Sequence, residues 1–115
     1  MKVKTSQLIG PALDWAVAKC ESETLSQSGF AFQIKVYGCL QRPHLGNWKP
    51  SSLWSQGGPI LERESIDVVK VGTRQWRADC GSACHGPTPL VAAMRAYVVK
   101  KWGHEVDVPD ELMGT

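Results

Sequence analysis

The stretch GPTPLVAAMRAYVVKKWG, residues 86–103, carries the clearest helix signal in the chain. Thr88 can cap a helix whose first turn contains Pro89, and Gly103 is typical of a helix end. The apolar residues that recur at helical spacing between them are Leu90, Val91, Met94, Tyr97, Val98 and Trp102. The pattern predicts a C-terminal helix that buries this stripe and exposes Ala92 on its opposite face.

Upstream, a second helix is predicted over residues 11–21. Pro11 suits the first helical position, because its fixed φ angle matches the helix and its missing N–H is not needed there. The apolar residues expected on one face of this helix are Ile9, Leu13, Ala16, Val17 and Cys20. A short third helix is expected at residues 59–64, and a single helical turn is expected after Pro109.

The intervening segments contain strand patterns. FAFQIKVY, residues 30–37, alternates apolar and polar positions as a half-buried strand does. IDVVKV, residues 66–71, and QWRADC, residues 75–80, are separated by a short glycine-containing gap that suits a hairpin. Residues 39–50 are expected to form a loop. The chain, residues 1–115, is therefore predicted to be a single α+β domain. Its small, mainly antiparallel sheet would pack with the N- and C-terminal helices, with αβα layering as an alternative.

Length and composition are those of one globular domain. The chain has 115 residues and a mass of 12.6 kDa, with 43% hydrophobic and 21% charged residues and a net charge of +2. The apolar N-terminal stretch is interrupted by Gly10, Pro11 and Asp14, so it matches neither a signal peptide nor a membrane span. We therefore expect a cytoplasmic protein, without a membrane partner, whose four cysteines are thiols.

Cys80, Cys84 and His85 form the tightest cluster of candidate metal ligands, in the sequence DCGSACHG. Thiolates and imidazoles bind zinc, but structural sites require four ligands, and no second ligand pair follows at suitable spacing. A nucleophilic Cys84 with His85 or His44 as its base would lack a third, orienting group. We therefore predict no metal, no cofactor and no catalytic set, and interpret the segment as a strand end followed by a glycine-rich connection.

The stretch WSQGGPILERES, residues 54–65, has two interpretations. Backbone N–H groups of Gln56, Gly57 and Gly58 could form an anion-binding nest at the start of a helix beginning at Pro59. However, a phosphate-binding loop needs a lysine followed by a hydroxyl residue, which are missing here. The interpretation favoured by the sequence is a turn at the two glycines that leads into a helix at Pro59.

Two of the five tryptophans, Trp48 and Trp54, lie in or beside the least regular segment of the chain. Tryptophan is typical of the centres of protein interfaces and of base-stacking platforms. Nucleic-acid binding depends mainly on phosphate contacts by basic side chains. This sequence has no basic run, and its candidate phosphate contacts are scattered: Lys49, Arg63, Arg74, Arg77 and Arg95.

Several of these segments resemble the NinX family of small proteins encoded by temperate bacteriophages. The similarity extends over most of the chain and rests on LDWAVA (13–18), WSQGGPILERESI (54–66), Trp76, GPTPLVAAMR (86–95) and VDVPDEL (106–112). The resemblance implies a phage or prophage origin and an accessory role inside an infected bacterium. Beyond this, the resemblance assigns no specific activity, because the family has no established one.

Together these features favour a non-enzymatic module that binds a host or phage protein. The residues expected to contribute to binding are Trp54, Gln56, Gly57, Gly58, Pro59 and Arg95. The alternatives are a nucleic-acid-binding accessory protein and a domain that binds a small anion or another small ligand. Self-association into a homo-oligomer is a further alternative for the partner.

Overall fold

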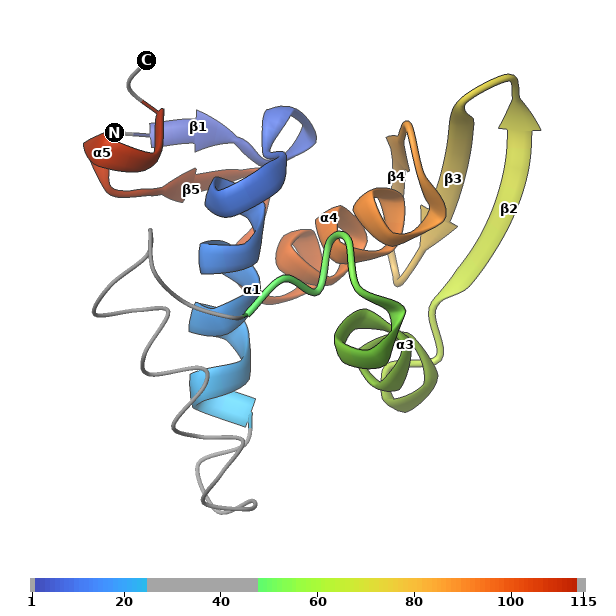
Figure 1. The fold of residues 1–115 in the computed structure, drawn as a ribbon, viewed down its shortest axis with the longest axis horizontal. Coiled ribbons are helices and arrows are strands. Elements are labelled where there is room, and N and C mark those ends of the chain that lie inside the picture. Colours follow the sequence, from blue (N-terminus) through green and yellow to red (C-terminus); the bar gives the residue numbers. More distant parts are fainter. Residues whose placement is uncertain (1, 25–47, 114–115) are drawn as a thin grey trace.

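The computed structural model describes residues 2–24 and 48–113. Its helices are η1 (Thr5–Gln7, a 3-10 turn), α1 (Gly10–Thr24), α3 (Trp54–Arg63), α4 (Pro89–Trp102) and α5 (Asp110–Met113). Its strands are β1 (Lys2–Lys4), β2 (Asp67–Gly72), β3 (Gln75–Asp79), β4 (Ala83–Gly86) and β5 (Glu105–Asp107). Figure 1 shows α4 in the middle of the molecule, between α1 and the sheet formed by β2, β3 and β4.

The α4 helix forms as its sequence predicts. The Thr88 side chain accepts a hydrogen bond from the Val91 N–H at 3.1 Å, and Gly103 ends the helix with a φ angle of 88°. The predicted solvent-facing side is wrong, however, because Ala92 is completely buried. A Cβ atom at Gly86 would lie 2.7 Å from the Ala92 nitrogen, so β4 packs directly on this face of the helix. The helix is therefore covered on both sides, by α1 and by the sheet.

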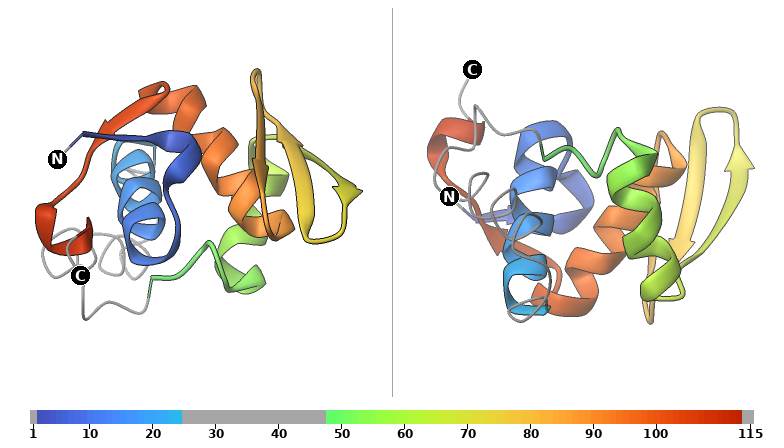
Figure 2. Two further views of the ribbon diagram at one scale, coloured as in Figure 1. Left: turned by 90° about the horizontal axis from the view of Figure 1, so that it is seen from above. Right: turned by 60° about the horizontal axis from the view of Figure 1, so that its bottom comes forward.

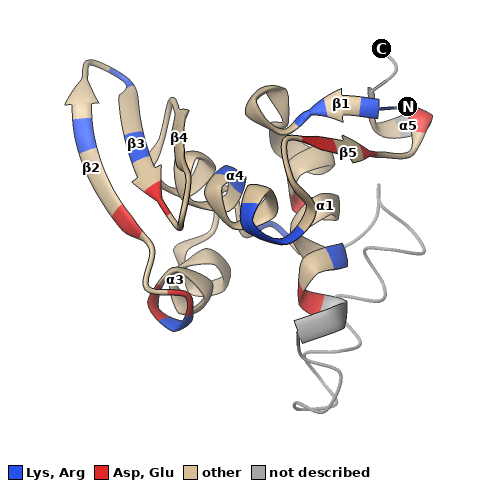
Figure 3. Cartoon of the chain, turned by 180° about the vertical axis from the view of Figure 1, so that it is seen from behind, with Lys and Arg blue, Asp and Glu red and all other residues tan. Residues whose placement is uncertain are grey.

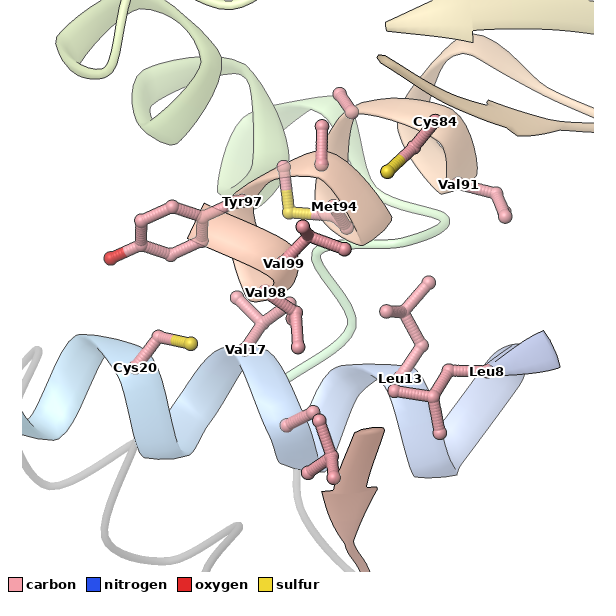
Figure 4. Packing of buried hydrophobic residues seen from close by; sticks show 14 of the residues in the cluster. Leu8, Leu13, Val17, Cys20, Cys84, Val91, Met94, Tyr97, Val98 and Val99 are labelled. Atoms are coloured by element: carbon pink, nitrogen blue, oxygen red, sulfur yellow. The ribbon is translucent and has the colours of Figure 1, made fainter. Parts of the chain in front are cut away.

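Figure 4 shows the packing that joins α1 to α4. Leu13, Val17 and Cys20 project from α1 toward α4, where Met94 and Val98 are fully buried. The predicted helix over residues 11–21 is confirmed and is longer at both ends. Burial of these side chains is the main favourable contribution to folding in this region.

The three-stranded sheet has the order β2-β3-β4, and both pairings are antiparallel. The predicted hairpin is confirmed, with its turn at Thr73 and Arg74, where Arg74 has a positive φ angle of 55°. The prediction of a connection after residue 80 misses β4, which returns along β3. Its inward-facing residues, Cys84 and Gly86, are too few to give a recognisable alternating pattern.

A second, two-stranded sheet joins the ends of the described chain. Val3 in β1 lies opposite Val106 in β5, and both side chains are buried. The sequence analysis did not predict this pairing. The predicted strand at residues 30–37 and most of the predicted loop at 39–50 lie outside the described residues.

The α+β class and the antiparallel pairing predicted from the sequence are confirmed. Within the described residues, the helices all lie on one side of the β2-β3-β4 sheet (Figures 1 and 2). In the described part of the chain, α1 therefore lies on one side of α4 and the sheet lies on the other. No described helix covers the outer face of this sheet.

Candidate functional site

An apolar groove lies where three helices begin. It has a volume of about 540 Å³ and is lined by residues at or just before the starts of α1, α3 and α4. The lining residues are Ile9, Gly10, Ser51, Ser52, Trp54, Pro87, Thr88, Pro89, Leu90 and Val91. Two large apolar side chains in this set are strongly exposed, Trp54 at 56% and Ile9 at 54% of their surface. Trp54 was predicted as a binding residue, whereas Ile9 was wrongly assigned to the buried face of α1.

The α3 helix begins at Trp54, five residues earlier than predicted. The backbone N–H groups of Gln56 and Gly57 both donate to the Leu53 carbonyl, at 3.0 and 2.9 Å. Two N–H groups of the proposed anion nest are thus used inside the first turn of a helix. Pro59 lies within the helix. The two glycines are therefore helical residues, and the predicted turn at this position is wrong.

Gly57 and Gly58 have different surroundings although they are adjacent. A Cβ atom at Gly57 would lie 2.4 Å from the Pro50 carbonyl oxygen and 2.7 Å from the Leu90 side chain. A Cβ atom at Gly58 would lie 3.8 Å from the Trp54 ring, which is ordinary contact. Gly57 therefore allows α3 to approach α4 and the segment before α3, and so helps to shape the groove.

The other predicted binding residues lie outside the groove lining. The Gln56 side-chain oxygen accepts a hydrogen bond from the Lys49 N–H, which holds the segment before α3. Arg95 lies on α4, where its Nε–H donates to the Leu8 carbonyl at 2.8 Å and its Nη1 donates to the His85 carbonyl at 2.7 Å. Burial lowers the pKa of Arg95. These contacts connect elements of the fold.

The segment that precedes α3 crosses from α1 toward α4 (Figure 2) and is fixed by a buried carboxyl group. The Ser51 N–H donates to Asp14 Oδ1 on α1 at 2.9 Å. Burial raises the pKa of Asp14, and the hydrogen bonds from Ser51 lower it by a smaller amount. Trp48, which was considered together with Trp54 for an interface or stacking role, is only 2% exposed. Of these two tryptophans, only Trp54 is available to a partner.

A second polar cluster, which the sequence analysis missed, joins α1, α3 and α4. Arg63 forms two hydrogen bonds to the completely buried carboxylate of Glu21, and the Tyr97 hydroxyl donates to the same carboxylate at 2.6 Å. Arg63 also binds Glu64, which contacts Lys100 at 3.2 Å. Burial lowers the pKa of Arg63, but the hydrogen bonds to Glu21 and Glu64 raise it by more, so the net shift is upward.

The sequence pattern of α3 suggests only solvent-facing charges at Glu62, Arg63 and Glu64, which holds for the exposed Glu62 but not for Arg63 and Glu64. A buried carboxylate requires hydrogen-bonded partners, and Glu21 finds them on two other helices. No local pattern reveals this pairing, since 42 residues separate Glu21 from Arg63. The cluster holds three helices together and lies outside the groove lining.

The cysteines and histidine of the DCGSACHG segment face different directions. Cys84 is buried, whereas His85, next in the strand, is exposed on the other face of the sheet. Burial raises the pKa values of both Cys80 and Cys84, which disfavours the nucleophilic thiolate. Within residues 2–24 and 48–113, no group of three or more His, Cys, Asp and Glu side chains is arranged to hold a metal ion. His44 lies outside the described residues.

The basic residues considered for nucleic-acid binding are not gathered into one patch. Arg63 and Arg95 are used in the contacts described above, and Arg74 and Arg77 lie on the hairpin. Figure 3 shows that the positions of positive and negative residues are spread over several of the described elements. This distribution gives little support to a continuous phosphate-binding surface.

The described structure defines a small α+β protein with an apolar groove at the starts of three helices. A sequence model described as "Bacteriophage P22, NinX" matches residues 4–101. The chain therefore belongs to the NinX family of bacteriophage proteins. No curated protein matches the sequence. Among the helices of the described residues, none is long and apolar enough to cross a membrane.

Proposed function

We propose that this phage-family protein acts as a non-enzymatic accessory module that binds a host or phage protein in the groove, with Trp54 as the anchor. The observation that carries the proposal is the exposure of Trp54 and Ile9, at 56% and 54%, beside a mainly apolar groove. Exposed large apolar side chains around a concavity are typical of binding sites, and tryptophan is enriched among residues that dominate binding energy. We place this interaction in the cytoplasm of the infected bacterium.

The chemistry of the groove supports binding over catalysis. Its described lining supplies hydroxyl groups from Ser51, Ser52 and Thr88 and contains no carboxyl, imidazole or thiol group. The Asp14 carboxyl beside Ser51 is buried and is used to hold the segment before α3. A hydroxyl nucleophile needs an adjacent base, and general acid–base catalysis needs a titratable side chain. The Thr88 hydroxyl is also used to cap α4. A partner's apolar side chain fits this lining better than a reacting polar group does.

The proposal is tested by site-specific photo-crosslinking in infected cells. A crosslinking amino acid at Ser52, an exposed residue of the groove lining, would become attached to any protein that occupies the groove. We expect one specific adduct, which Trp54→Ala abolishes. The matched control is Val69→Ala, which shortens an apolar side chain of similar exposure (55%) on β2, outside the groove lining.

Three outcomes would contradict the proposal: no protein adduct at Ser52, an adduct of undiminished yield with Trp54→Ala, or an adduct removed by nuclease. Circular dichroism of the purified Trp54→Ala variant supplies the folding control. Because Trp54 is mainly exposed, this variant should retain the helical spectrum and most of its thermal stability.

A further inference from the structure

The outer strand of the three-stranded sheet offers a second interaction surface. β2 pairs with β3 along one edge, and no other described residue pairs with its opposite edge. Two apolar side chains of this strand are strongly exposed, Val69 at 55% and Val71 at 48%. A strand edge with unpaired backbone groups and exposed apolar side chains is a ready template for an added strand. Figure 1 shows β2 at the outer boundary of the molecule.

The charges of the β2–β3 hairpin differ between its two ends. Lys70 and Arg74 lie toward the turn, whereas Asp67 and Asp79 lie at the other end, directly opposite each other across the two strands. Figure 3 shows blue segments toward the turn and red segments toward the opposite end. Like charges opposite each other in a sheet are unfavourable. Arg77 reduces the repulsion between Asp67 and Asp79 only weakly. Its 3.8 Å contact to Asp79 joins two side chains that are each 49% exposed, so solvent screens the attraction.

We propose that the β2 edge pairs antiparallel with the β2 edge of a second copy of this chain. Antiparallel pairing places Arg74 of each hairpin near Asp67 of the other, whereas parallel pairing would set Asp67 near Asp67 and Arg74 near Arg74. It also places Val69 and Val71 of the two copies alongside one another, where both lose water-exposed surface. The two three-stranded sheets then form one continuous sheet. This surface shares no residue with the groove lining, and the inference does not rest on the proposed function.

The self-complementary charges explain why a second copy is favoured over an unrelated strand. A symmetric dimer brings the same surface from both subunits together, so each acidic end must meet a basic turn for the charges to match. The hairpin supplies both within one chain. The bulge between Lys70 and Gly72 further limits which strands can align with this edge.

Charge reversal combined with sedimentation velocity over a range of concentrations tests this proposal. We expect the wild-type chain to dimerise with rising concentration. Asp67→Lys and Arg74→Glu, made separately, should each weaken self-association by roughly tenfold, because each places like charges together at both ends of the dimer. A mixture of the two variants should regain association, since basic residues at positions 67 and 74 of one copy then meet acidic residues at the same positions of the other. The double variant should also regain it.

Two further variants complete the experiment. Val69→Lys adds a charge at the centre of the edge and should weaken dimerisation by roughly tenfold or more. Lys49→Glu changes the net charge as Arg74→Glu does but lies before α3, and should leave dimerisation unchanged. Thermal unfolding of each variant reports whether the monomer fold is kept. A wild-type chain that stays monomeric at every concentration, or dimerisation insensitive to Asp67→Lys, Arg74→Glu and Val69→Lys, would overturn the proposal.

Discussion

Replacing each of the adjacent glycines of α3 by alanine should have opposite effects on stability. In Gly57→Ala, the new Cβ atom would lie 2.4 Å from the Pro50 carbonyl oxygen and 2.7 Å from the Leu90 side chain. The Leu90 side chain has some freedom to move, but the carbonyl oxygen moves only if the backbone before α3 shifts. Overpacking of this kind costs about 3 kcal/mol, and the better helix propensity of alanine returns about 1 kcal/mol. The net loss is about 2 kcal/mol.

Gly58→Ala is the matched comparison. Its Cβ atom would be 3.8 Å from the Trp54 ring, and the residue already has a helical backbone with a negative φ angle. This variant should therefore gain about 0.5–1 kcal/mol from helix propensity and from the smaller entropy of its unfolded chain. Urea denaturation measures both free energies, and the corresponding Tm shifts are roughly 4 °C per kcal/mol for a domain of this size. Equal stabilities, or a more stable Gly57→Ala variant, would refute the close packing of α3.

Three further predictions concern buried groups. Arg63→Ala leaves the Glu21 carboxylate buried without its cation and should cost about 3 kcal/mol in urea denaturation; adding Glu21→Gln should recover much of the loss, and no recovery would argue against the ion pair. Ala92→Glu places a charge between α4 and β4 and should abolish cooperative thermal unfolding, which a near-wild-type Tm would contradict. Asp14 has a raised pKa in the folded state, so its protonated form stabilises the fold. This stabilisation is fully present at pH values below the ordinary pKa of 3.8 and is lost as the pH rises through the folded-state pKa of Asp14. Asp14→Asn, which keeps an oxygen for the Ser51 N–H, should therefore raise the unfolding free energy at neutral pH. This advantage should disappear on acidification, and a pH-independent difference would contradict the assignment.

Local signals predict the elements whose ends are marked by capping residues or by turn residues. Thr88 and Gly103 delimit α4 as expected, and the gap between residues 71 and 75 becomes the hairpin turn. The start of α3 was misplaced because Pro59 is typical of a first helical position, whereas the actual N-cap, Leu53, forms no side-chain cap. A helix start without a capping residue leaves no sequence signal.

Elements that depend on distant partners were not predictable in this way. β1 and β5 have three residues each, and their pairing joins Val3 to Val106 across almost the whole chain. Glu21 looks like an ordinary helix-end charge until Arg63 and Tyr97 reach it from other helices. In both cases the local sequence carries no periodicity that distinguishes a buried partner from an exposed residue.

The groove illustrates the same limit for a candidate site. Trp48 and Trp54 have similar irregular surroundings in the sequence, yet one is 2% and the other 56% exposed. The difference arises because the segment before α3 is held to α1 through Asp14, while α3 approaches α4 through Gly57. These contacts shape the groove wall beside Trp54. An exposed tryptophan is therefore a consequence of how three helices meet, and its role is best tested by variants that change its side chain and leave those contacts intact.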